Sequence, residues 1–162
     1  MTLNALPPAS IRPATLADSQ AVFEAHQDSV LTLCAGAYTP LQMQTWFEGR
    51  THQVHWPAIQ AGQILVAERE GRVLGFAGFV PGEVTLLFVR PEAAGSGLGG
   101  QLFRLAMAQA EIGHDGPLTV VATRNSQGFY ERHGFVAKEA SFFVRGAAEL
   151  RYEVVNMQRA ER

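Results

Sequence analysis

The sequence predicts an α+β fold in layers, with one mixed, mostly antiparallel and twisted sheet of six to seven strands and helices on both faces. Two observations carry this prediction. Apolar runs at 63–68, 72–80 and 83–89 are separated by short turns and indicate three neighbouring antiparallel strands. A helical pattern at 97–111 then leads to a further apolar run at 117–122, which is typical of a crossover between parallel strands.

The composition is that of a single globular domain. The chain has 162 residues, of which 47% are hydrophobic and 17% are charged, so it can build a sizeable core. We expect residues 1–10 to form a flexible tail and residues 11–162 to form the domain. The formal net charge of −2 gives no electrostatic reason to expect nucleic acid as a partner.

The sequence favours a cytoplasmic protein without membrane association. Its first residues lack the basic and apolar regions of a secretory signal. No apolar run approaches the roughly 20 residues that a membrane span requires. The single Cys34 excludes an internal disulfide and suits a reducing compartment. We interpret Cys34 as a small buried hydrophobic residue in preference to a nucleophile.

The first part of the chain predicts one strand and two helices. Ile11 opens a short strand, and Thr15 or Asp18 can cap a helix that continues to about Asp28. Pro40 is typical of a first helical turn and predicts a second helix through Phe47.

The last part of the chain predicts a short helix and two strands. Ser126 can cap this helix and Gly134 can end it. Apolar runs at 135–139 and 150–157 indicate the final strands. The sequence shows no internal repeat or linker that would divide it.

Aromatic and imidazole side chains gather between 26 and 56, outside the predicted strands; they are His26, Cys34, Tyr38, Trp46, His52, His55 and Trp56. They can line a substrate cleft, with His26, Tyr38 and Trp46 as substrate-binding candidates. In the alternative interpretation the tryptophans only pack helices against the sheet. A metal site at His52 and His55 would need further ligands, and we predict no metal.

A glycine-rich turn joins the strand at 83–89 to the helix at 97–111; it reads Gly95-Ser96-Gly97-Leu98-Gly99-Gly100. The first N–H groups of a helix lack intrahelical partners, and glycines let an anion approach them closely, so the turn predicts a phosphate site. An ordinary tight turn is the alternative. Gln101 after Gly100 excludes a P-loop, and the mid-chain position of the strand disfavours a dinucleotide site.

Two motifs give this turn a context. The stretch from Val89 to Gly99, VRPEAAGSGLG, resembles the acetyl-CoA signature of the GNAT superfamily of N-acetyltransferases, with Ala94 where Gln or Arg is usual. The stretch from Asn125 to Phe135, N-x-x-x-F-Y-E-x-x-G-F, resembles the motif after the fifth strand of that family. The resemblance covers roughly residues 11–158, and 38–46 looks like a subgroup of small bacterial members.

The resemblance implies transfer of an acetyl group from acetyl-CoA to a primary amine, by direct attack in a ternary complex. An N–H group of Phe88 or Val89 would stabilise the thioester oxygen. Tyr130 would stabilise or protonate the leaving thiolate. The implied cofactor-binding residues are Leu87, Phe88, Val89, Gly95, Ser96, Gly97, Leu98, Gly99, Gly100, Asn125 and Tyr130.

Glu83 matches a strand position where several family members carry a catalytic glutamate, so the resemblance makes it a candidate base. A solvated turn carboxylate is the alternative interpretation of Glu83. His26 and His55 are alternative bases, because imidazole titrates near neutral pH.

The acceptor is expected to be a small-molecule or peptide amine, and the sequence does not name it. A non-catalytic acyl-CoA-binding or regulatory module on the same fold is the competing function. A third alternative is an acceptor amine linked to nucleic acid, which the net charge of −2 disfavours. The sequence leaves open whether the chain forms a homodimer.

Overall fold

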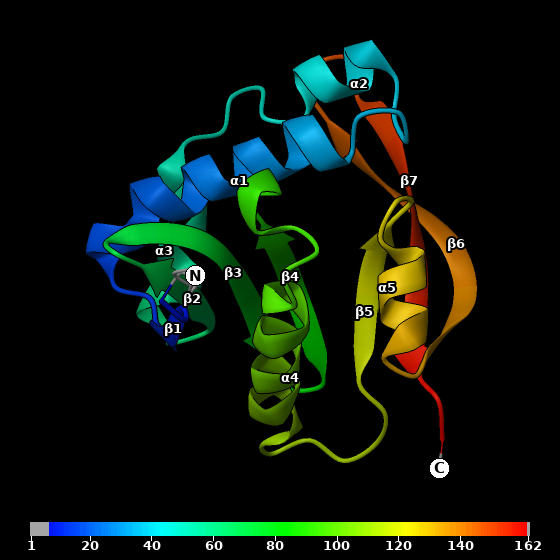
Figure 1. Ribbon diagram of the computed structural model, residues 1–162. Helices are drawn as coiled ribbons and strands as arrows, with labels where there is room; N and C mark the ends of the chain where they lie inside the picture. Colours follow the sequence, from blue (N-terminus) through cyan, green and yellow to red (C-terminus); the bar gives the residue numbers. More distant parts are fainter. Residues whose placement is uncertain (1–6, 162) are drawn as a thin grey trace, which may run out of the picture.

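The computed structural model describes residues 7–161 and contains a seven-stranded sheet with the strand order β1-β2-β3-β4-β5-β7-β6 (Figure 1). Only β4 and β5 pair in parallel; the other neighbours are antiparallel. The predicted fold class and the predicted crossover are therefore confirmed. The strands are β1 (Ser10–Pro13), β2 (Ile64–Arg69), β3 (Arg72–Val80), β4 (Glu83–Val89), β5 (Thr119–Thr123), β6 (Phe135–Arg145) and β7 (Leu150–Arg159).

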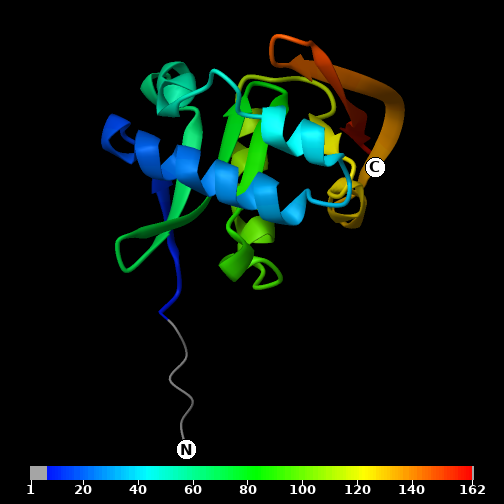
Figure 2. The same ribbon diagram turned by 90° about the horizontal axis from the view of Figure 1, so that it is seen from above.

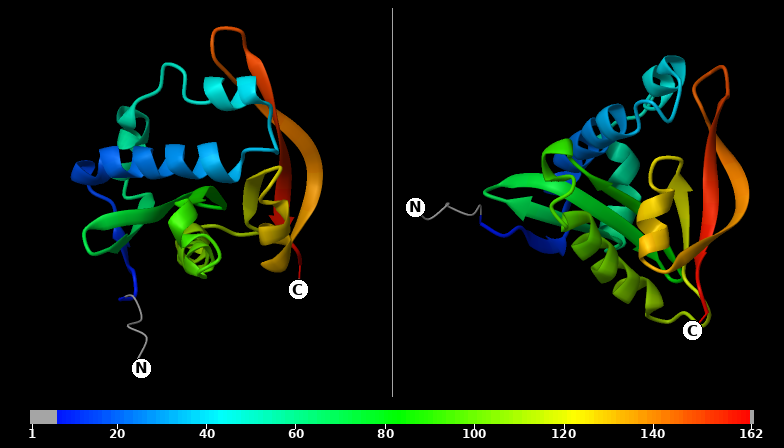
Figure 3. Two further views of the ribbon diagram at one scale, coloured as in Figure 1. Left: turned by 45° about the horizontal axis from the view of Figure 1, so that its top comes forward. Right: turned by 45° about the vertical axis from the view of Figure 1, so that its right-hand side comes forward.

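Helices cover both faces of this sheet. The α-helices are α1 (Ser19–Leu33), α2 (Pro40–Thr45), α3 (Trp56–Gln60), α4 (Leu98–Glu111) and α5 (Gln127–Arg132), and the 3₁₀ turns are η1 (Leu16–Asp18), η2 (His52–His55) and η3 (Pro91–Ala93). α1 extends across one face of the sheet (Figure 2), whereas α4 packs on the opposite face (Figure 3). Each face therefore has its own hydrophobic core.

The spacing of apolar residues explains which side each long helix buries. In α1, Val22, Ala25 and Val30 are fully buried at intervals that fall on one helical face. In α4, Leu102 and Ala106 are fully buried one turn apart. These stripes fix α1 and α4 against the strands that border the candidate site.

Some element boundaries differ from those predicted. α1 continues past Asp28 to Leu33, and β6 continues past residue 139 to Arg145 because β7 pairs with it along its length. The segment 52–60, for which no element was predicted, forms η2 and α3. Most of the predicted tail, residues 1–6, lies outside the described residues, and β1 already begins at Ser10.

The parallel pair β4–β5 is joined only at its beginning. Glu83 is level with Thr119 and Val84 with Val120, and no pairing follows. β4 carries a bulge at Thr85, since Phe79 is level with Val84 but Gly78 with Leu86. Beyond the bulge the two strands diverge (Figure 1).

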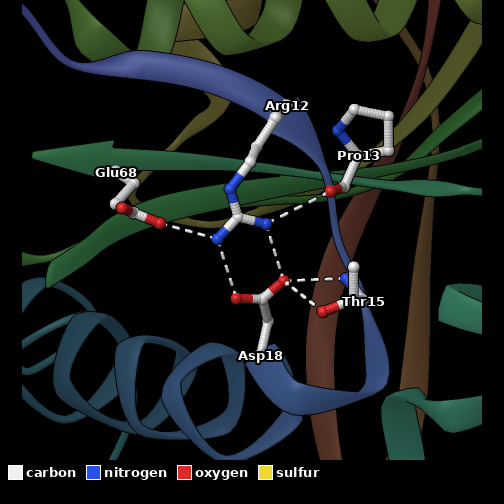
Figure 4. Close-up of polar contacts among 5 residues, drawn as sticks. All are labelled: Arg12, Pro13, Thr15, Asp18 and Glu68. Atoms are coloured by element: carbon white, nitrogen blue, oxygen red, sulfur yellow. Dashed lines mark hydrogen bonds and ion pairs between the residues drawn. The ribbon is translucent and has the colours of Figure 1, made fainter. Parts of the chain in front are cut away.

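An ion-pair network fixes the start of α1 to the edge of the sheet (Figure 4). The Arg12 guanidinium donates to both carboxylate oxygens of Asp18, at 2.8 and 2.9 Å, and to Glu68 on β2 at 2.6 Å. The Asp18 carboxylate also accepts the backbone N–H of Thr15 at 2.7 Å, in a capping box. The hydrogen bonds from Arg12 hold the pKa of the buried Asp18 carboxyl at about 2.

Replacing Asp18 should destabilise the fold in a pH-dependent way. Because its pKa is about 2 in the folded chain and near 3.8 otherwise, the carboxylate stabilises the fold above pH 4. That contribution is lost as pH falls through 2. We expect Asp18→Asn to lower the free energy of unfolding at pH 7 by about 2 kcal/mol. Urea unfolding should show this difference shrinking between pH 4 and pH 2.

The matched control is Glu92→Gln, which breaks the exposed Arg72–Glu92 ion pair. An exposed pair contributes less than about 1 kcal/mol. Equal losses in Asp18→Asn and Glu92→Gln would show that the Arg12 network contributes no more than a surface contact.

Candidate active site

A cavity of about 520 Å³ occupies the gap that the divergence of β4 and β5 opens. β4 lines it from Val84 to Val89, and β5 lines it with Val121 and Thr123. Residues of α4 and α5 border it from one face of the sheet, and residues of α1 and η2 border it from the other. The cavity therefore connects the two faces through the sheet.

The turn before α4 presents backbone donors at one end of this cavity. Gly95 and Gly97 adopt left-handed conformations, with φ of 75° and 88°, which glycine reaches without strain. Within the described residues, the N–H groups of Gly95, Gly97, Gly99 and Gly100 have no acceptor. A side chain at Gly95 or Gly97 would meet no other atom within 4 Å, so the turn is open to a ligand.

Two nitrogen-bearing side chains stand beside the same turn. A Cβ placed on Gly100 would lie 3.3 Å from Arg104 Nη1 and 3.5 Å from His133 Nε2. The start of α4 adds the positive end of a helix dipole. The predicted anion site thus combines free N–H groups with the guanidinium of Arg104 and the imidazole of His133. Ser96 and Leu98 contribute through the turn's shape: Ser96 Oγ donates to the Ala93 carbonyl, and the Leu98 side chain is buried.

The edge of β4 that faces the gap offers further N–H groups. Arg90 N–H donates to Leu74 O on β3, and Phe76 is level with Phe88. Because N–H groups alternate sides along an antiparallel strand, the N–H of Phe88 also faces β3. The N–H groups of Leu87 and Val89 then face the gap. Of the two predicted N–H donors, this register favours Val89.

Tyr130 lies where α5 meets the cavity. Its ring is buried and packs on Phe103 and Phe129, with ring centroids 5.2 Å apart in both cases. Burial raises the pKa of Tyr130, so the hydroxyl keeps its proton at neutral pH. Among the described residues the hydroxyl has no hydrogen-bond partner, although Tyr130 lines the cavity. The hydroxyl is therefore available to a ligand.

Asn125 and Cys34 join the two sides of the cavity. Asn125 Nδ2 donates to Leu33 O at 3.2 Å, which ties the loop after β5 to the end of α1. Both Asn125 and Cys34 line the cavity. The Cys34 thiol is buried, as predicted, and burial raises its pKa to about 11. A thiol with that pKa is a poor nucleophile at neutral pH.

The end of the cavity near α1 holds two neutral imidazoles. His26 packs on Phe88 at 4.2 Å and lies 5.6 Å from His55, measured between ring centroids. Burial, followed by the charges of His55, Arg50 and Arg145, lowers the pKa of His26 to about 3. Burial and Arg50 lower the pKa of His55 to about 4. Within the described residues, His26 Nδ1 and His55 Nε2 are buried without a hydrogen-bond partner.

Trp46, a predicted substrate-binding residue, lines this end of the cavity. Four further residues that line it were not part of the predicted site: Arg50, Val54, Phe143 and Arg145. Arg50 follows α2, whereas Arg145 ends β6. No local sequence signal joins these two arginines, because only the long β6–β7 hairpin brings residue 145 beside α2 and η2.

Tyr38 does not line the cavity. Its hydroxyl donates to Glu153 O at 2.7 Å and accepts the N–H of Arg124 at 3.1 Å. Its ring packs against Trp46 with centroids 5.2 Å apart. Tyr38 thus fastens the segment before α2 to β7 and to the loop after β5.

Glu83 lies in a neighbouring hollow of about 320 Å³, with Lys138, Glu139 and Asn156. It stands where β4 and β5 are still paired. Val121 lines both spaces, so this hollow adjoins the cavity. Burial raises the pKa of Glu83.

Metal-binding clusters and membrane-spanning helices are absent from the part of the chain that the structure describes. No group of three or more His, Cys, Asp or Glu side chains in residues 7–161 is arranged to hold a metal ion. No helix in the same range has the length and apolar character to cross a membrane.

Comparison with known proteins gives the arrangement a family context. A family model described as an acetyltransferase (GNAT) domain matches residues 34–156. No curated protein matches the chain. A solved GCN5-related N-acetyltransferase from Rhodopseudomonas palustris shares 22% identity with a TM-score of 0.82, over 99% of this chain and 100% of that one.

Two further solved structures contain ligands. PaiA N-acetyltransferase from Thermoplasma acidophilum, in complex with coenzyme A, has a TM-score of 0.74 at 20% identity, covering 96% of this chain and 100% of its own. YncA, a putative acetyltransferase from Salmonella typhimurium with its cofactor acetyl-CoA, has a TM-score of 0.68 at 20% identity, covering 96% of each chain. At these identities the likeness shows a common fold.

Proposed function

The chain belongs to the GNAT acetyltransferase family, and from that membership we propose that it transfers an acetyl group from acetyl-CoA to a primary amine, in a ternary complex. The observation that carries this proposal is the cavity between β4 and β5. It extends from the glycine turn on the α4 face, where Gly99 lines it, to His26 and His55 on the α1 face. Two substrates can therefore enter from opposite faces and meet within the sheet.

The turn from Gly95 to Gly100 fits the pyrophosphate of acetyl-CoA. Its free N–H groups can donate to phosphate oxygens, and the helix dipole favours the negative charge. Arg104 stands beside the turn and can add positive charge, although Ala94 replaces the usual Gln or Arg. Asn125 and the gap-facing edge of β4 would border the pantetheine arm.

The thioester supplies an activated acetyl group, and the chain's own groups assist its transfer. The N–H of Val89 faces the gap and would donate to the thioester oxygen as negative charge develops there. The Tyr130 hydroxyl is protonated and unpartnered, so it would donate to the leaving sulfur. Both groups belong to fixed elements, β4 and α5, which hold them in place before the substrates bind.

Glu83 is the proposed acceptor of the amine proton, acting through water in the hollow that adjoins the cavity at Val121. The raised pKa of Glu83 brings its basicity closer to neutral pH. His26 and His55 line the cavity directly, but pKa values of about 3 and 4 make them weak bases. Basicity therefore favours Glu83 over the imidazoles.

The cofactor site can be tested with Gly97→Glu, which places a side chain and a negative charge where phosphate oxygens would lie. We expect affinity for acetyl-CoA to fall roughly 10-fold or more, because charge-assisted hydrogen bonds are lost. Calorimetric titration measures this affinity directly. The parent protein should also melt at a higher temperature with acetyl-CoA, whereas the variant should not.

The control is Gln109→Glu, which makes the same charge change at an exposed position near the far end of α4. It should bind acetyl-CoA as the parent does. A melting curve without ligand checks that Gly97→Glu is folded, since its left-handed backbone disfavours a side chain. Parent-like binding by Gly97→Glu would show that the pyrophosphate site lies elsewhere.

Catalysis itself can be tested by thiol release from acetyl-CoA with a panel of amines, in the parent and in Tyr130→Phe. The variant keeps the ring packing on Phe103 and removes only the hydroxyl. We expect turnover to fall roughly 10-fold or more with acetyl-CoA affinity retained, since the interaction belongs to the transition state. Unchanged turnover would make Tyr130 a packing residue. Acetyl-CoA binding without turnover on any amine would identify a non-catalytic module.

If Glu83 accepts the amine proton, Glu83→Gln should lower turnover by roughly 10²–10⁴-fold with little change in acetyl-CoA affinity. The matched control is Glu139→Gln, which removes a carboxylate from the same hollow, where Glu139 accepts a hydrogen bond from Asn156. Steady-state kinetics across pH compares the two variants. Near-parent turnover in Glu83→Gln at every pH would assign the proton to a histidine or to solvent.

A further inference from the structure

The acceptor end of the cavity carries a net positive charge. We infer that the acceptor amine bears an anionic group, a carboxylate in an amino-acid-like arrangement, which Arg50 and Arg145 bind. This inference rests on the proposed acetyl transfer and specifies the class of its second substrate. It depends on three observations: the charges that line the cavity, the partners of the two arginines, and the separation from the cofactor turn.

The charged side chains that line the cavity are all positive. Arg50 and Arg145 line it, and no Asp, Glu or Lys of the described chain does so. The neighbouring imidazoles of His26 and His55 are neutral at pH 7 because of their lowered pKa values. A substrate that enters this end therefore meets two cations and no carboxylate.

Neither arginine has an ionic partner among residues 7–161, in which six other ion pairs form. Arg145 stacks over Phe143 at 4.6 Å from the ring centroid, and its Nη1 donates to Val144 O at 2.9 Å. Its Nε is buried without a partner. An unpartnered guanidinium N–H at the wall of a cavity is a donor that a bound anion can complete.

The two guanidinium groups also act on each other. Burial lowers the pKa of Arg145, and the charge of Arg50 lowers it further. Glu48 is the nearby carboxylate, but it accepts the N–H of Ala147 at 3.2 Å and does not line the cavity. The repulsion between the arginines is therefore not relieved within the described chain, and an anion between them would relieve it.

The position of the arginines separates this charge from the cofactor. Arg50 and Arg145 lie near His26 and His55, on the α1 side of the sheet. The glycine turn, with Arg104 and His133, lies at the start of α4 on the opposite face. The phosphates of acetyl-CoA therefore have Arg104 and the free N–H groups of the turn as partners, which leaves Arg50 and Arg145 for the acceptor.

The chemistry of the pocket favours a carboxylate attached to a mainly apolar amine. A guanidinium matches the planar carboxylate in geometry as well as in charge. Trp46 and Phe143, with ring centroids 5.4 Å apart, give the same pocket apolar walls. Polyamines and basic peptides would instead place positive charge beside the two arginines.

The first arm of the test measures thiol release with a panel of α-amino acids, each beside its carboxamide, starting with phenylalanine and phenylalaninamide. Each pair shares its side chain, and the carboxamide lacks the negative charge; the carboxamide also lowers the pKa of the amine, which favours the amide and so works against the expected preference. We expect kcat/KM to be roughly 10- to 100-fold higher for the acids, as loss of a charge-assisted pair predicts. Arg145→Gln and Arg50→Gln should each remove most of this preference.

The control is Arg151→Gln. Arg151 lies outside the cavity, over the exposed ring of Phe142 at 4.3 Å from its centroid. This variant should keep the parent's preference for acids. Melting curves establish that all three variants are folded.

The second arm measures binding without turnover, by calorimetric titration of N-acetyl amino acids and their carboxamides into the parent and Arg145→Gln in the presence of coenzyme A. If the parent binds the acids more tightly and Arg145→Gln loses this preference, the inference is supported, whether or not thiol is released. Absence of thiol release would overturn the proposed transfer instead. Equal use of acids and amides by an active parent overturns the inference and leaves the transfer standing. Equal binding of both forms, or binding of neither, also overturns it.

Discussion

The divergence of β4 and β5 after Val84 and Val120 is the constraint on which the site depends. Each of these strands is held on its outer side, β4 by β3 and β5 by β7, so the gap persists without a ladder across it. The exposed edge of β4 then carries backbone groups that need water or a ligand as partners. A closed parallel pair would remove both the cavity and the N–H of Val89 that faces it.

Because the gap passes through the sheet, its two ends lie on different faces and can bind different ligands. The α4 face combines a glycine turn, free N–H groups and the guanidinium of Arg104, which suits a phosphate-bearing ligand. The α1 face combines apolar rings, neutral imidazoles and two arginines, and none of these groups donates to the turn. The ion-pair network at Arg12 positions this second face, since it fixes the start of the helix that carries His26. The proposed direct transfer would use this passage, because it lets two substrates meet without a covalent intermediate on the chain.

Local sequence signals predicted the strands, the crossover helix and the glycine turn, because the start and end of each element depend on neighbours within a few residues. The boundaries of the glycine turn and of β3 and β4 follow from such signals. The acceptor end could not be predicted in this way. Arg50 and Arg145 come from distant parts of the chain, and β6 reaches Arg145 only through its register with β7. Tyr38 was predicted to contact substrate, yet its hydroxyl is engaged by Glu153 and Arg124, contacts that no short motif encodes.

The acceptor end is costly to the folded protein as it stands. His26 Nδ1, His55 Nε2 and Arg145 Nε are buried without partners in the described chain, and an unsatisfied buried polar atom costs about 1–3 kcal/mol. Apolar residues of similar size would avoid that cost. Three such atoms lie around one cavity, beside two arginines without an ionic partner in the described chain, so water or a bound ligand would supply the partners that the protein does not. A carboxylate has two acceptor oxygens, so it could accept from Arg145 Nε and from Arg50 at once, which a simple alkylamine could not do.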